Sequence, residues 1–273
     1  MHWEWHGRRG PPILLLHGFA TNGYTWRGWL PELARHHRVL VVDLKGAGSA
    51  QKPDDDAYGP QDQALLLHRL IVHQDLTELT LVGHSLGGGI ALLTALHLLE
   101  NDSPRLRRLA LVAGAAYRQP IPFFIRLAAR PFLGPLALRI LPSSLVIRAG
   151  LRRAYHHPEH ITSSQVEAYA QPLRDPAGRR ALSRMARQIV PPEMEGLSSR
   201  YGKVTVPTLL LWGKEDSIVP LRIGKRLAGD LPRAHLAVLS DCGHMPQEEK
   251  PRESLEVFLE FLAREGAPTP KSP

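Results

Sequence analysis

Cysteine is nearly absent from this chain, which has only Cys242 among its 273 residues. A single cysteine excludes an internal disulfide and is typical of a protein in a reducing cytoplasm. Long hydrophobic runs are also missing, since no uncharged apolar stretch approaches the length that spans a bilayer. Residues 1–6 lack the basic and apolar regions of a secretory signal. We therefore expect a cytoplasmic protein.

Acidic residues are scarce in the middle of the chain. Residues 117–200 contain 13 arginines, no lysine and only 5 aspartates or glutamates, whereas the rest of the chain holds 21 basic and 21 acidic residues. The whole net charge of +8 therefore lies in this segment. A basic segment alone does not indicate a nucleic-acid partner, because no nucleic-acid reading module is recognisable in the sequence.

Short apolar runs alternate with helical patterns over most of the chain. The predicted strands lie at 3–5, 13–16, 39–43, 79–83, 108–113, 207–213 and 234–239. The predicted helices lie at 26–36, 63–74, 90–96, 222–229 and 252–263. Strands that alternate with helices predict an α/β fold with a doubly wound, mostly parallel sheet.

Residues 117–200 interrupt this alternation. They have helical apolar spacing and no strand-like run, and they are too many for a plain loop. We predict a helical cap, or lid, that is inserted between a first core part at 1–116 and a second at 201–265. The proline-rich tail, 266–273, is predicted to be disordered.

A Gly83-x-Ser85-x-Gly87 motif lies between a predicted strand and a predicted helix. This is the context of a nucleophile elbow, a sharp turn that exposes a serine hydroxyl at the carboxyl end of a strand. The turn leaves no space for side chains two residues either side of the serine, so both flanks are glycine. The following helix directs its positive end at the oxygen that becomes charged.

A serine hydroxyl needs a base that takes its proton, and the base needs a carboxylate that orients it. Asp216 follows the strand predicted at 207–213, and His244 follows the strand predicted at 234–239. The order serine, acid, histidine along the chain is the one that accompanies a nucleophile elbow. The long gap between Ser85 and Asp216 holds the predicted cap.

Five motifs stand in order, each at a predicted strand end: His17-Gly18-Phe19, Asp43-x-x-Gly46-x-Gly48, Gly83-His84-Ser85-Leu86-Gly87-Gly88, Gly213-x-x-Asp216-x-x-Val219-Pro220 and Gly243-His244-x-Pro246. Together they resemble the α/β-hydrolase superfamily, in its esterase- and lipase-like serine hydrolases with a helical lid. The resemblance covers residues 13–263, apart from the cap in detail. Two features depart from it: the family's first strand is missing, which we interpret as a trimmed sheet edge, and Ala50 replaces a serine outside the triad.

The resemblance implies a role for each residue of the site. Ser85 is the expected nucleophile, His244 the general base and then acid, and Asp216 the residue that orients the histidine. The backbone N–H groups of Phe19 and Leu86 are the expected oxyanion hole, where they stabilise the developing charge. No metal and no organic cofactor is implied.

Side chains near these motifs are weaker candidates. Glu215 is an alternative to Asp216 as the acid, although Asp216 fits the motif register better. Cys242 is interpreted as a small packing residue. For His17 and His84 a structural hydrogen-bonding role is favoured over a catalytic one. Both still belong to the tentative substrate contacts, which are His17, Gly18, His84, Phe123, Phe124 and Met245.

Residues 156–160 read His-His-Pro-Glu-His, which formally contains the zinc-hydrolase pattern H-x-x-E-H. That pattern needs an unbroken helix to bring both histidines to one face. Pro158 lies inside it and would break the helix, so we do not assign zinc to these residues.

The chain from 121 to 155 mixes apolar residues with arginines and contains no acid. One interpretation is a lid helix that covers the pocket with its apolar face while the arginines face water. The other is a basic amphipathic surface that contacts anionic lipid or an aggregated lipid substrate. Both predict an apolar pocket ceiling, which favours substrates with hydrophobic acyl or alcohol groups.

These observations predict a serine hydrolase that acts on small hydrophobic carboxylic esters. A different reaction on the same triad, such as carbon–carbon cleavage, lactone hydrolysis or perhydrolysis, stays open. Epoxide hydrolases and haloalkane dehalogenases are disfavoured, because their elbow nucleophile is aspartate and here it is Ser85. A ligand receptor or binding scaffold with slow hydrolysis is the alternative of another class. The chain could be a monomer or a dimer.

Overall fold

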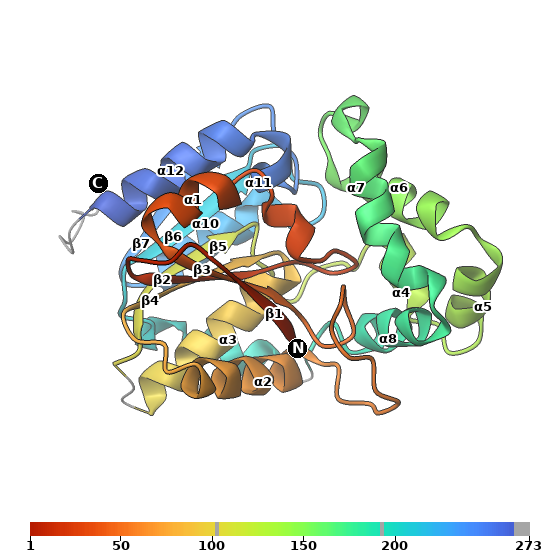
Figure 1. The fold of residues 1–273 in the computed structure, drawn as a ribbon, viewed down its shortest axis with the longest axis horizontal. Coiled ribbons are helices and arrows are strands. Elements are labelled where there is room, and N and C mark those ends of the chain that lie inside the picture. The colour runs from red at the N-terminus through yellow and green to blue at the C-terminus, as the bar shows by residue number, and fades with distance from the viewer. Residues whose placement is uncertain (102–103, 192–193, 265–273) are drawn as a thin grey trace.

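A seven-stranded sheet forms the centre of the computed structural model, which describes residues 1–101, 104–191 and 194–264 (Figure 1). The strands are β1 (His2–His6), β2 (Pro12–Leu16), β3 (Arg38–Asp43), β4 (Leu79–His84), β5 (Leu106–Val112), β6 (Thr208–Gly213) and β7 (Ala234–Leu239). Their spatial order is β1-β3-β2-β4-β5-β6-β7. β1 pairs antiparallel with β3, and all the other pairs are parallel. The predicted mostly parallel, doubly wound sheet is confirmed.

Helices cover both faces of the sheet, which explains why its strands are continuous apolar runs. Successive side chains of a strand point to opposite faces. In β2, Leu14 and Leu16 join one core, and Ile13 and Leu15 join the other. The first core packs against α2 (Pro60–His73), α3 (Leu86–Glu100) and α10 (Leu221–Asp230), and the second against α1 (Leu30–His36) and α12 (Pro251–Ala263).

The first predicted helix, 26–36, is wrong in extent. The chain forms a 3₁₀ turn at Gly23–Trp26 and begins α1 only at Leu30. Pro31 lies in the first turn of α1, where the missing N–H of proline costs no hydrogen bond. Gly28 lies between the two elements, where a Cβ atom would come within 2.8 Å of Pro251. A helix that ran on from Trp26 would have Pro31 in its interior, where proline breaks the turn, so the chain begins a new helix just before it.

The edge of the sheet next to β3 is formed by β1, the antiparallel strand. Within the described residues no strand lies outside it. Trp3 and Trp5 of this strand are partly exposed, and the indole N–H of Trp5 donates to Gln74 at the end of α2. A short edge strand that ends in solvent agrees with the interpretation of a trimmed sheet edge.

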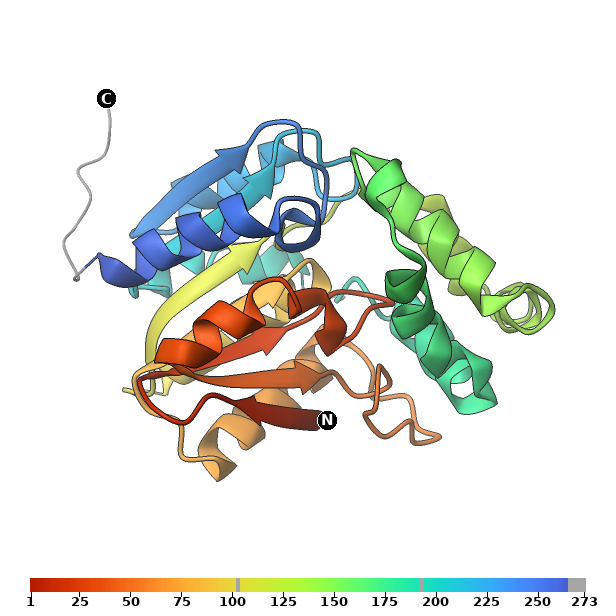
Figure 2. The same ribbon diagram turned by 45° about the horizontal axis from the view of Figure 1, so that its top comes forward.

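Between β5 and β6 the chain forms helices only, in the part that the structure describes. They are α4 (Phe123–Ala128), α5 (Leu133–Ile140), α6 (Ser143–Ala154), α7 (Ser163–Ala170), α8 (Pro176–Arg187) and α9 (Met194–Ser198), with 3₁₀ turns at Pro158–His160, Gln171–Arg174 and Tyr201–Lys203. Figure 2 shows α4–α8 as a separate layer beyond the carboxyl ends of the strands. The boundaries of the cap as a domain stay a prediction. The tail predicted at 266–273 lies outside the described residues.

The short α11 (Pro246–Glu249) lies between β7 and α12, and it directly follows the loop that carries His244. Each of the described helices is too short or too polar to cross a membrane.

Candidate active site

Ser85 forms the corner between β4 and α3. Its backbone has φ 53° and ψ −117°, a conformation that non-glycine residues rarely adopt. A Cβ atom on Gly83 would lie 2.2 Å from the carbonyl oxygen of Gly87, and one on Gly87 would lie 2.3 Å from the carbonyl oxygen of His17. The flanking glycines are therefore required by space, and the strained corner presents the Ser85 side chain at the end of the sheet.

Ser85, His244 and Asp216 lie in one hydrogen-bonded line. The Nε2 atom of His244 lies 2.8 Å from Oγ of Ser85, and its Nδ1 atom lies 2.8 Å from Oδ2 of Asp216. The other carboxylate oxygen of Asp216 accepts the N–H groups of Ile218, at 2.8 Å, and Val219, at 2.9 Å. Both oxygens of this buried carboxylate are thus held in place, and the carboxylate in turn fixes the orientation of the imidazole.

The loop that carries His244 is held from two sides. Its N–H donates to the carbonyl of Ala154 at the end of α6, at 2.7 Å, and its carbonyl accepts Nε2–H of His84, at 2.9 Å. Burial, and then the neighbouring His244, holds the pKa of His84 well below its usual value. His84 is therefore a neutral donor that supports the histidine loop.

The expected oxyanion donors lie on either side of Ser85. Leu86 is the first residue of α3, where a backbone N–H has no acceptor one turn earlier. The loop with Gly18 and Phe19 follows β2 and approaches the serine closely, since a Cβ atom on Gly18 would lie 3.1 Å from Cβ of Ser85. The role of these N–H groups as an oxyanion hole stays a prediction.

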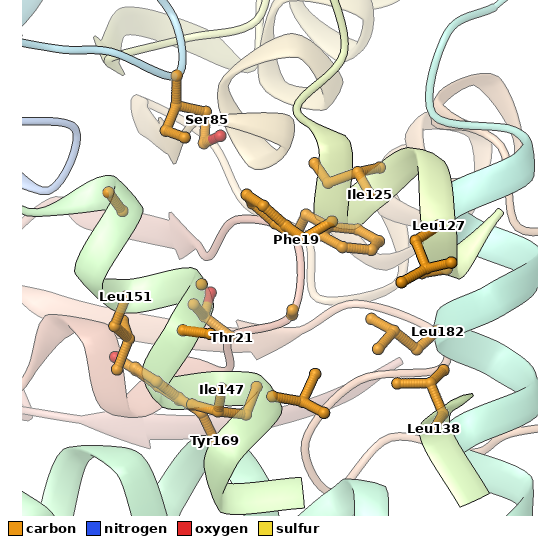
Figure 3. A pocket seen from close by; sticks show the side chains of 18 of the residues that line it. Phe19, Thr21, Ser85, Ile125, Leu127, Leu138, Ile147, Leu151, Tyr169 and Leu182 are labelled. Atoms are coloured by element: carbon orange, nitrogen blue, oxygen red, sulfur yellow. The ribbon is translucent and has the colours of Figure 1, made fainter. Parts of the chain in front are cut away.

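A cavity of about 260 Å³ opens beside Ser85, and Figure 3 shows the side chains gathered around it. Most of its wall comes from the inserted helices and is apolar. Among the residues that line it, Thr21, His84, Ser85, Tyr169 and His244 carry the polar side chains, and none is lysine, arginine, aspartate or glutamate. This cavity can enclose a hydrophobic group, but it offers no partner to a buried charge.

Three of the six tentative substrate contacts line this cavity, namely His84, Phe124 and Met245. Phe123 does not, because it begins α4 on the face opposite Ile125 and is 73% exposed. This corrects the expectation for Phe123.

His17 and Gly18 do not line the cavity either. His17 is fully buried, with Nε2 accepting the N–H of Leu44 and Nδ1 donating to the carbonyl of Gly18. Burial lowers the pKa of His17, although nearby Asp43 opposes the shift. His17 therefore has no surface left for a substrate and instead supports the loop that leads to Phe19, whereas substrate contact by Gly18 stays a prediction.

The weaker candidates have other partners. The Glu215 carboxylate accepts the N–H of Cys242, at 3.0 Å, whereas Asp216 faces His244. Cys242 is fully buried, and burial raises the pKa of its thiol. A buried thiol with a raised pKa is unreactive, in agreement with a packing role.

The H-x-x-E-H segment does not lie on a helix, because α6 ends at Ala154 and Pro158 begins a 3₁₀ turn. His156, His157 and Asp241 instead form the group of side chains that could hold a metal ion among the described residues, with candidate ligand atoms within 4.8 Å of one another. All are at the surface, and His157 contacts Asp241 at 2.7 Å and Glu159 at 3.0 Å. These contacts tie the inserted helices to the loop before His244.

Glu248, on α11, belongs to none of the sequence motifs. Its side chain is fully buried and accepts hydrogen bonds from Thr25, Arg27 and Tyr169, at 2.7, 2.5 and 2.7 Å, and also from Gln165. Burial and this carboxylate raise the pKa of Tyr169. Glu248 therefore joins the core, the inserted helices and the histidine loop at one point. Its partners are far apart in the sequence, so no local motif signals them.

A family model described as "Alpha/beta hydrolase family" matches residues 13–257. The chain belongs to the alpha/beta hydrolase family. Among the relatives of this alpha/beta hydrolase, the "Uncharacterized hydrolase YugF" of Bacillus subtilis is 29% identical, with 96% of this chain and 92% of the relative covered. The 2-hydroxymuconate semialdehyde hydrolase of a Pseudomonas species is 27% identical, with 94% and 89% covered.

A solved structure of a thermophilic esterase from Thermogutta terrifontis is also similar to this alpha/beta hydrolase. It is 26% identical, has a TM-score of 0.76, and covers 96% of this chain and 92% of its own. The similar proteins thus include a hydrolase of 2-hydroxymuconate semialdehyde and an esterase.

Proposed function

We propose that this alpha/beta hydrolase cleaves carboxylic esters with hydrophobic groups through an acyl-enzyme on Ser85. The observation that carries the proposal is the line of Ser85, His244 and Asp216, with both side-chain contacts at 2.8 Å, at the wall of an apolar cavity. A hydroxyl in this arrangement becomes a nucleophile when the imidazole takes its proton.

In the proposed reaction, Oγ of Ser85 attacks the ester carbonyl while Nε2 of His244 accepts its proton. The N–H groups of Leu86 and Phe19 stabilise the negative oxygen of the tetrahedral intermediate. His244 then gives its proton to the departing alkoxide, which leaves as an alcohol. Water, with its proton taken by His244, attacks the acyl-enzyme and releases the carboxylic acid and Ser85.

The lining of the cavity favours esters over charged carbon–carbon substrates. A muconate semialdehyde, the substrate in the Pseudomonas relative's name, carries a carboxylate. None of the described residues that line the cavity is lysine or arginine, so a carboxylate there would be buried without a cationic partner. An uncharged acyl or alcohol chain has no such cost, and its burial is favourable.

We also propose that the inserted helices act as a lid over this site. Ile125 on α4, Leu138 on α5 and Ile147 on α6 line the cavity opposite Ser85. These helices form most of the cavity wall, so their side chains control which groups enter.

The test is a panel of p-nitrophenyl esters of increasing acyl length, measured beside a vinylogous diketone that reports carbon–carbon cleavage. We expect turnover of the esters, a preference for apolar acyl groups and little cleavage of the diketone. Preferred cleavage of the diketone would replace the ester proposal by carbon–carbon hydrolysis. A fluorophosphonate probe that labels wild type no faster than Ser85→Ala would contradict any serine hydrolase and favour a binding scaffold.

A further inference from the structure

The outer face of α5 is apolar although it lies at the surface. Phe132, Leu136 and Ile140 follow one another at intervals of four residues, which places them in a row along one side of the helix. Their exposed fractions are 87%, 51% and 69%. We call these three residues the apolar ridge. The opposite side of α5 lines the cavity through Ala137 and Leu138. The helix is thus apolar on two sides, whereas a surface helix normally turns a polar side to the solvent.

Other exposed apolar side chains gather on the neighbouring helices. Phe123 begins α4, Leu141 follows α5 and Leu145 lies in the first turn of α6, and all are exposed. Of the 12 large exposed hydrophobic residues in the described part of the chain, six lie between Phe123 and Leu145. Single exposed apolar residues are ordinary, but such a cluster marks a surface that contacts something.

The segment of chain that carries the ridge has charged side chains of a single sign. Between Asp102 and Glu159 the sequence contains no acidic residue. Within the described residues no ion pair involves any of the arginines of α4, α5 and α6 or of the turn after α4, namely Arg126, Arg130, Arg139, Arg148, Arg152 and Arg153. Elsewhere in the molecule arginines such as Arg107 and Arg174 pair with carboxylates. An anionic partner is the electrostatic complement of this face.

We propose that the face formed by the apolar ridge and these arginines binds the surface of an anionic lipid bilayer. Such a surface accepts apolar side chains at the level of the acyl chains and offers phosphates to arginine at the level of the headgroups. A second copy of the chain, placed on the same face by a twofold axis, would bring arginines against arginines. A nucleic acid would pair with the arginines but leave the ridge in water.

The position of this face places bound lipid beside the cavity. Leu141 lines the cavity and is also about half exposed, so the cavity reaches the surface next to the ridge. A lipid-dissolved ester could enter there and reach Ser85; this consequence rests on the proposed function, whereas lipid binding does not.

The test measures binding of the full chain to vesicles in the absence of substrate. We expect co-sedimentation with vesicles that mix phosphatidylcholine and phosphatidylglycerol, little with phosphatidylcholine alone, and loss of binding as salt is added. Arg126→Gln, Arg130→Gln and Arg139→Gln together should weaken binding about 100-fold, at roughly 1 kcal/mol for each arginine. Phe132→Ser, Leu136→Ser and Ile140→Ser together should weaken it at least about tenfold.

Matched controls exist on the other side of the molecule. Leu65→Ser with Val72→Ser changes two exposed apolar residues of α2, and Arg8→Gln with Arg9→Gln removes two exposed arginines near β1. Both should bind vesicles like wild type. Equal losses in the controls and in the ridge or arginine variants would overturn the proposal, as would binding that ignores the phosphatidylglycerol content.

Two further outcomes would assign the face to another partner. A wild-type dimer in analytical ultracentrifugation that the ridge variant dissociates would show that a second copy covers the ridge. Tight binding of a single-stranded oligonucleotide, lost in the arginine variant and kept in the ridge variant, would favour a nucleic acid. Thermal unfolding and fluorophosphonate labelling of each variant check that the fold and the Ser85 site persist.

Discussion

The sheet core and the inserted helices differ in how far their apolar side chains are buried and in how their polar side chains are held. In the core, β2, β4 and β6 are buried along their whole length, and Asp216 and His244 are each held by side-chain and backbone partners. In the insertion, α5 exposes the apolar ridge on one side and lines the cavity on the other. The reacting groups thus lie on the rigid part, and the surfaces that choose substrate and partner lie on the insertion.

Because the reacting groups lie in the core, we expect the largest loss of activity from a substitution there. Ser85→Ala removes the oxygen that attacks the carbonyl and should lower kcat for p-nitrophenyl ester hydrolysis by about 10⁴-fold or more. Thermal unfolding should change little, because the Ser85 side chain is only partly buried and hydrogen-bonds to the side chain of His244. Ser144→Ala, at an exposed serine of α6, is the matched control and should retain activity. Equal activity of wild type and Ser85→Ala would show that the hydrolysis comes from elsewhere.

The second prediction separates the two neighbouring acids. Asp216→Asn keeps the size of the side chain but opposes His244 with an amide, and should lower kcat by about 10³–10⁴-fold. Glu215→Gln should lower it by less than about tenfold, because Glu215 contacts the backbone of Cys242 and not the imidazole. The pair is compared at a single pH with the same ester. The reverse order of effects would assign the orienting role to Glu215.

The candidate catalytic residues of the core could be predicted from the sequence because they follow the carboxyl ends of parallel strands. Ser85, Asp216 and His244 each lie within five residues of the carboxyl end of a parallel strand, so their side chains had to meet at one edge of the sheet. In the inserted helices, no strand end fixes which side chains face the cavity. The first of these helices, α4, is only six residues long, and a shift of one residue rotates a helix face by about 100°. The sequence therefore could not decide that Phe124 lines the cavity and that Phe123 faces solvent.

Glu248 shows a second limit of the sequence. Its partners come from the segment after β2 and from the insertion, so they meet Glu248 only in the folded chain. The same is true of one His17 contact, in which Nε2 accepts the N–H of Leu44 from the separate loop after β3. Contacts of this kind have no periodicity and no fixed spacing, and only tertiary structure shows them.

The third prediction tests the junction of the two regions. Glu248→Gln leaves Arg27 without a carboxylate partner in a partly buried position, and should lower the free energy of unfolding by about 2 kcal/mol. The measurement is urea unfolding at neutral pH. Glu256→Gln is the control, since Glu256 is exposed on α12, and should change stability by no more than about 0.5 kcal/mol. Equal stabilities of the two variants would mean that the Glu248 contacts do not hold the regions together.

The smallest effect concerns pH and the buried histidines of the core. His17 has a lowered pKa in the folded chain, whereas the unfolded chain takes up a proton at the ordinary value of about 6.5. Below that pH the unfolded state therefore binds more protons than the folded state, so stability falls as the pH falls and is regained as the pH rises through 6.5. His84, which also has a lowered pKa, adds to the same slope.

Each buried histidine contributes at most about 1.4 kcal/mol per pH unit to this slope. The charge nearest to His17 is Asp43, whose oxygen lies 3.9 Å from Nε2 and opposes the shift without forming a hydrogen bond. Urea unfolding between pH 5 and 8 should therefore show a smaller slope for His17→Gln than for wild type, whatever its absolute stability. His73→Gln, at an exposed histidine of α2, should keep the wild-type slope. An unchanged slope in His17→Gln would mean that His17 accepts a proton as readily in the folded chain, although protonation of Nε2 would remove the acceptor of the Leu44 N–H.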